Sequence, residues 1–135
     1  MEFGAHWSDK WLGTTFRPGE YDCLDFVQEV MATDFGRELK IPARHRGENV
    51  RIMARDIAAL GGIAADPIQS SPVDGDGVLL KPRGTRIPGY HVGVVAIISG
   101  EIFVMHCVEV MGGVRFPAAT IEDHGWTVEG YYRWL

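Results

Sequence analysis

The sequence predicts an α+β fold: a single domain over residues 1–135, with helices first and a C-terminal antiparallel sheet of about five strands second. Apolar residues with helical spacing are confined to the first half of the chain. The second half consists of short β-branched or aromatic runs between turn signals. Because helices and strands are segregated and do not alternate, the pattern favours α+β over a βαβ repeat. The length suits one domain with one core.

The clearest helix begins at Cys23. Apolar side chains follow the i, i+3, i+4, i+7, i+8 spacing of one buried stripe, namely Cys23, Phe26, Val27, Val30 and Met31. Asp22 is a good N-cap for this helix and Gly36 a suitable end. A short helix is expected before it, over residues 8–12, and another after it, from about 49 to 60. Residues 37–48 and 64–77 are interpreted as loop and connection.

Five short strands are expected next, over residues 78–80, 92–98, 102–108, 113–116 and 127–134. The turn signals between them include Ser99-Gly100, which has the length of a two-residue hairpin loop. That loop pairs Ile98 with Glu101 and brings His91 and His106 to one face of two neighbouring strands, about 7–8 Å apart on a diagonal. Cys107 then points to the opposite face.

Composition excludes several functional classes. The balance of 13 basic and 18 acidic residues gives a net charge of -5, which argues against nucleic acid as a partner. The longest apolar run, residues 92–98, is far shorter than the roughly 20 residues of a membrane span. No signal peptide is visible, so the chain is expected to be made in the cytoplasm. Two cysteines give no disulfide framework, and a reduced pair is expected.

Cys23 and two histidines form the candidate site. A thiol at the first turn of a helix is favoured as thiolate by the helix dipole, although Asp22 and Asp25 oppose this. Cysteine chemistry needs a nucleophile, a base and a group that orients the base; Cys23, His91 and His106 could meet if the helix packs on the sheet. The alternatives are a small buried cysteine, a core histidine, and a zinc site made of these three residues and Cys107. The zinc site lacks close ligand spacing and needs both faces of one strand.

Several motifs resemble the NlpC-type, papain-like cell-wall cysteine peptidases. Residues 12–19 and 21–27, with the Asp22-Cys23 pair at a helix start, resemble the segment around the nucleophile of that family. Residues 72–76 resemble its Pro-Gly-Asp turn, residues 91–95 its His-Val-Gly base motif, and residues 104–106 the strand that carries the third polar residue. Residues 130–133 resemble its closing strand. The resemblance spans about residues 11–134, and the order cysteine, histidine, third polar residue is its most specific feature.

This resemblance implies a papain-like fold and hydrolysis of amide bonds in peptidoglycan stem peptides. Cys23 is the implied nucleophile, His91 the general base and His106 the residue that orients it, with no cofactor and no metal. The compact form resembles versions carried in phage or prophage tails, which implies virion tail-tip proteins as partners and no membrane. Two departures are Leu24-Asp25, where the family has serine and glycine, and Phe16, where the family often has an aromatic hydroxyl that helps to stabilise the oxyanion. The second departure leaves the backbone N–H of Cys23 as the main oxyanion donor, unless Tyr21 substitutes.

Two further functions stay open on the sequence. One is a structural tail-tip or tail-assembly protein that keeps the fold without useful catalysis. The other is a secreted toxin-type peptidoglycan amidase with the same chemistry. Thiol reactivity separates the enzyme from the structural protein, because an active-site cysteine reacts faster than a buried structural one.

Overall fold

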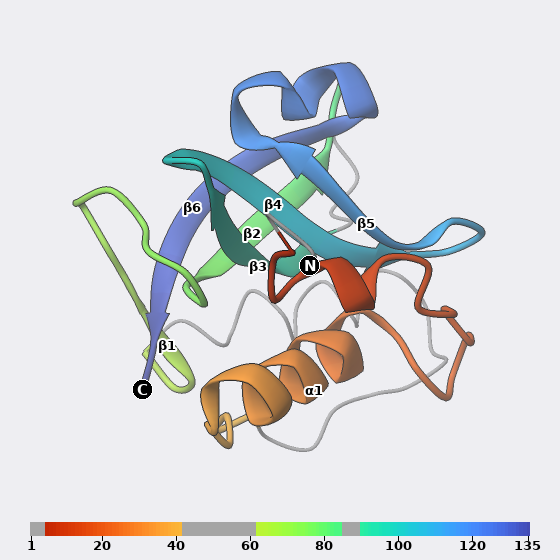
Figure 1. Cartoon of the computed structure of the whole chain (residues 1–135), viewed down its shortest axis with the longest axis horizontal. Coiled ribbons are helices and arrows are strands. Elements are labelled where there is room, and N and C mark those ends of the chain that lie inside the picture. Colours follow the sequence, from red (N-terminus) through yellow and green to blue (C-terminus); the bar gives the residue numbers. More distant parts are fainter. Residues whose placement is uncertain (1–4, 42–61, 85–89) are drawn as a thin grey trace.

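Within residues 5–41, 62–84 and 90–135, which the computed structural model describes, six strands form one antiparallel sheet (Figure 1). Their spatial order is β1-β6-β2-β3-β4-β5. The strands are β1 (Ala65–Pro67), β2 (Gly77–Pro82), β3 (His91–Ile98), β4 (Glu101–Val108), β5 (Gly112–Pro117) and β6 (Trp126–Trp134). The predicted α+β class is confirmed. β1 is an additional strand within a segment expected to be connection.

The predicted central helix is present as α1 (Cys23–Phe35). Asp22 caps its start, and Gly36 ends it in the left-handed conformation, with φ 63°. The short N-terminal helix is a single 3-10 turn, η1 (Asp9–Trp11), and Ser8 makes no side-chain cap bond to it. The helix expected at about 49–60 lies outside the described residues.

The sheet is covered on both faces, by α1 on one side and by the 3-10 segment η2 (Ala118–His124) on the other (Figure 1). The side under α1 holds the larger apolar cluster, to which α1 contributes its predicted stripe and the strands contribute Val92, Val94, Met105 and Cys107. The opposite side holds Val78, Leu80, Val95, Val104 and Ile121. Alternate residues of each strand therefore enter different cores.

The hairpin of β3 and β4 has the predicted register, with Ile98 opposite Glu101 and Val94 opposite Met105. Ser99 and Gly100 both have positive φ, at 51° and 78°, as a type I′ turn requires. A bulge interrupts the pairing of β2 with β6, where Leu80 faces Val128 but Leu79 faces Gly130. Beyond the bulge the side chains of β6 change face, so Trp126 and Tyr132 enter different clusters.

The segment that leads to Cys23 is held against β5. Gly113 donates its N–H to the carbonyl of Thr14 and accepts from the N–H of Gly13, each at 2.9 Å. A Cβ at Gly113 would lie 2.2 Å from the carbonyl oxygen of Trp11, so this approach requires glycine. Among the described residues, no helix has the length and apolar character needed to cross a membrane.

Candidate active site

The first turn of α1 is fixed by a capping box. Asp22 Oδ1 accepts from the N–H groups of Leu24 and Asp25, at 3.0 and 3.3 Å. Asp25 Oδ2 in turn accepts from the N–H of Asp22 at 2.9 Å. These bonds satisfy N–H groups that the helix itself leaves without partners, and they set Cys23 as its first residue.

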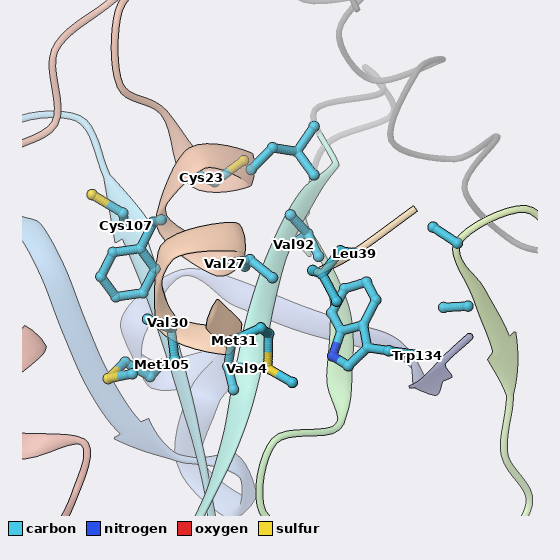
Figure 2. Packing of buried hydrophobic residues seen from close by; sticks show 14 of the residues in the cluster. Cys23, Val27, Val30, Met31, Leu39, Val92, Val94, Met105, Cys107 and Trp134 are labelled. Atoms are coloured by element: carbon cyan, nitrogen blue, oxygen red, sulfur yellow. The ribbon is translucent and has the colours of Figure 1, made fainter. Parts of the chain in front are cut away.

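Cys23 is buried, with 3% of its surface exposed, in the apolar cluster between α1 and the sheet. Figure 2 shows it at the start of α1, beside the end of β3 that carries Val92. Cys107 belongs to the same cluster, and its thiol donates a 3.6 Å hydrogen bond to the carbonyl of Thr14. Burial, and secondarily the charge of Asp22, raises the pKa of Cys107 to about 11. Cys107 is therefore an unreactive thiol at neutral pH.

His91 and His106 lie together, as the hairpin register predicts. Their ring centroids are 6.2 Å apart and their planes are nearly perpendicular, at 89°. His91 pairs with Leu80, which belongs to the cluster on the side of the sheet away from α1. His106 lies between Met105 and Cys107, which both belong to the cluster under α1, so its own side chain points to the opposite side. The prediction that the two histidines share one face and Cys107 occupies the other is confirmed.

Both imidazoles are neutral at pH 7. Burial lowers the pKa of His91 to about 4, and the negative charge of Asp22 opposes this shift. Burial, with a smaller contribution from the neighbouring His91, lowers the pKa of His106 to about 3. Asp22 is the N-cap of α1, so the charge that opposes this shift comes from the residue before Cys23. A neutral imidazole at this position is able to accept a proton.

Among the described residues, three buried ring nitrogens have no hydrogen-bond partner: Nδ1 of His91, and both Nδ1 and Nε2 of His106. A buried polar atom without a partner costs about 1–3 kcal/mol, so such atoms need an explanation. His106 is fully buried, with 0% of its surface exposed, whereas His91 is partly exposed. The two rings therefore meet by edge-to-face contact, without a hydrogen bond at these atoms.

The structure does not bring Cys23 onto the histidine face. α1 packs on the side of Val92 and Cys107, because its apolar stripe needs an apolar partner and alternate residues of β3 and β4 supply one there. Cys23 and Cys107 thus share one side of the sheet, and His91 and His106 point to the other. A zinc site made of these four residues would need both sides. Across the described part of the chain, no group of three or more His, Cys, Asp or Glu residues could hold a metal ion.

Tyr21 does not present a free hydroxyl in place of Phe16. Its Oη donates a 2.6 Å hydrogen bond to Glu29. Burial, with that hydrogen bond to Glu29 as a further cause, raises the pKa of Tyr21 well above its ordinary value. Phe16 packs against the cluster under α1.

Trp126, the first residue of β6, is a site residue that the sequence pattern does not reveal. Its ring centroid lies 4.5 Å from that of His91 and 5.1 Å from that of His106. The periodicity of the strand predicts a start one residue later, and the pairing of β6 with β2 is needed to place this indole beside the histidines.

No protein-family model matches the chain, and no curated protein matches it significantly.

Proposed function

We propose that this chain is a papain-like, NlpC-type cysteine peptidase that hydrolyses amide bonds in peptidoglycan stem peptides. In this proposal Cys23 is the nucleophile, His91 the general base and His106 the residue that orients His91. The substrate class, and a role in a phage or prophage tail tip that opens the cell wall locally, are taken from the sequence resemblance.

One observation carries the proposal. Cys23 is the first residue of α1 and lies beside the end of β3 that begins with His91. The start of a helix carries a partial positive charge, which favours the thiolate form of a cysteine. Asp22 links the two residues, because it caps the helix at Cys23 and its charge also acts on His91.

Neutral His91 has a nitrogen lone pair that can take a proton, and its pKa of about 4 makes it a weaker base than an ordinary imidazole. In the resting enzyme His91 is neutral and takes the proton from Cys23 Sγ. The sulfur then attacks the substrate carbonyl carbon and a C–S bond forms. The imidazolium gives its proton to the leaving amine as the C–N bond breaks, and water hydrolyses the thioester with His91 again acting as base. Asp22 stabilises the imidazolium formed in the first step, since its negative charge favours protonated His91.

The proposal has a defined geometric requirement. Because the His91 side chain extends from the face opposite α1, the thiol and the imidazole must meet around the end of β3. His91 is the first residue of that strand and is partly exposed. The backbone N–H of Cys23 is then the oxyanion donor, because the hydroxyl of Tyr21 is bound to Glu29.

Digestion of purified peptidoglycan, with mass analysis of the released peptides, tests this function. Cys23→Ala and Cys23→Ser should abolish release, and His91→Ala should lower the rate by about 10²–10⁴-fold. His106→Ala should reduce the rate less, and His106→Gln should retain more activity than His106→Ala. Cys107→Ser is the matched control, because Cys107 lies in the same apolar cluster as Cys23 but belongs to β4 and not to α1. Full activity of Cys23→Ala would show that the peptidase proposal is wrong.

A second candidate is a structural tail-tip protein that retains the fold without catalysis. It is favoured by the position of the histidines on the face away from α1 and by their three nitrogens without partners. Alkylation with iodoacetamide at pH 7 separates the two candidates. The peptidase predicts that Cys23 reacts faster than Cys107 and that His91→Ala slows Cys23 alone. Equal, slow labelling of both cysteines, together with no peptide release, supports the structural protein.

A further inference from the structure

Trp126 contacts both histidines of the candidate site. Its plane is inclined by 56° to that of His91 and by 89° to that of His106, with centroid distances of 4.5 and 5.1 Å. These distances lie in the range in which aromatic rings attract one another, about 4.5–7 Å. Since His91 and His106 also meet edge to face, the three rings form a closed aromatic cluster.

Hydrogen bonding does not explain how His106 keeps its orientation, and Nδ1 of His91 contributes no hydrogen bond either. Within the part of the chain that the structure describes, Nδ1 of His91 and both ring nitrogens of His106 have no hydrogen-bond partner. An imidazole that acts as a base normally has its other nitrogen held by a carboxylate, a carbonyl or another polar group. Among the described residues, the ring of His91 contacts the rings of His106 and Trp126. Packing against the indole of Trp126 therefore constrains the orientation of the two imidazole rings.

The position of Trp126 is set by groups other than the histidines. Gly125 ends η2 in the left-handed conformation, with φ 90°, and its carbonyl accepts a 2.9 Å hydrogen bond from the N–H of Arg83. Trp126 then pairs with Pro82 at the end of β2. The backbone on both sides of the indole is fixed by η2 and β2, so the ring is a preorganised wall for the imidazoles.

We infer that Trp126 is the positioning residue of the histidine pair, holding the planes of His91 and His106 by ring contact where Nδ1 of His91 and both ring nitrogens of His106 make no hydrogen bond. The catalytic meaning of this assignment rests on the proposed function. The indole also keeps water from the unpartnered ring nitrogens and thereby favours neutral imidazoles. The charged group whose field reaches His91 is Asp22, and each histidine is the other's titratable neighbour.

The test combines a spectroscopic measurement with kinetics on the full chain. In protein labelled with ¹⁵N-histidine, the ring signals of His91 and His106 are followed against pH in wild type, Trp126→Phe and Trp126→Met. Trp126→Met keeps an apolar side chain but removes the ring, and it should raise both titration midpoints by about one pH unit or more and remove the ring-current shifts. Trp126→Phe keeps an aromatic wall and should resemble wild type. Trp7→Phe is the control, because Trp7 contacts His6 and Phe35 and not the histidine pair.

Kinetics on peptidoglycan fragments supply the second measurement. Trp126→Met should lower kcat by roughly 10–100-fold with KM little changed, because misplacing a catalytic group by a small distance has effects of that order. Trp126→Phe should rescue most of the loss. Histidine signals that are unchanged in Trp126→Met, with the fold intact by circular dichroism, would overturn the inference whatever the activity. Altered histidine signals alongside a wild type that releases no peptide would overturn the proposed function and confirm the ring contact alone.

Discussion

Lowering the pH from 7 to 5 should destabilise the folded chain, because His91 and His106 are buried as neutral imidazoles. Their pKa values in the fold are about 4 and about 3, below the ordinary 6.5 that applies to the unfolded chain. Between these values the unfolded state binds more protons than the folded state, so the free energy of unfolding falls as the pH decreases. The loss begins near pH 6.5 and is complete only below the pKa values of the folded state.

The loss of unfolding free energy at pH 5 depends little on how far each pKa is lowered. Both folded-state values lie below 5, so the loss is set by the distance of pH 5 from the unfolded value, about 1.5 pH units. That distance corresponds to about 2 kcal/mol for each histidine. The two together amount to about 4 kcal/mol, a large part of the 5–15 kcal/mol typical of a folded domain.

Urea unfolding at pH 7 and pH 5, monitored by tryptophan fluorescence, measures this loss. His106→Leu removes one of the two titrations and should lose about 2 kcal/mol less than wild type over the interval. At pH 7 the variant should be as stable as wild type or more so, because it also removes two buried nitrogens without partners. His124→Gln is the matched control, since His124 is exposed. An equal loss in wild type and His106→Leu would refute the reasoning.

Two further predictions concern the elements that hold the site. Asp22→Ala should cost about 1–2 kcal/mol of unfolding free energy because it removes both cap bonds, while Asp22→Asn, measured by the same urea titration, should retain most of the stability. Gly93→Ala should destabilise by about 1–3 kcal/mol, since its Cβ would lie 2.6 Å from the carbonyl oxygen of Met105 and would force β3 away from β4. Gly130→Ala is the control in thermal unfolding, because its Cβ would make only ordinary contacts, and equal Tm values for the two variants would contradict the steric argument.

The helix and the hairpin could be predicted from the sequence because local interactions decide them. The stripe from Cys23 to Met31 has helical spacing, and Asp22 and Gly36 mark its ends through bonds to neighbouring residues. The two residues Ser99 and Gly100 fix the register of β3 and β4, and with it the shared face of His91 and His106. These features need only a few neighbours along the chain, so the local sequence determines them.

The remaining features depend on contacts between residues far apart in the chain, and only the tertiary structure decided them. β1 is three residues long and exists because the distant strand β6 pairs with it, with Ala65 opposite Trp134 and Pro67 opposite Tyr132. The bulge opposite Leu79 and Leu80 changes the face of β6, which no alternation pattern records. The side of the sheet that α1 covers, and hence the separation of Cys23 from the histidine face, follows from matching whole apolar surfaces. Trp126 reaches the histidines through that same long-range pairing, because side-chain contacts across a sheet are set by strand order and not by sequence spacing.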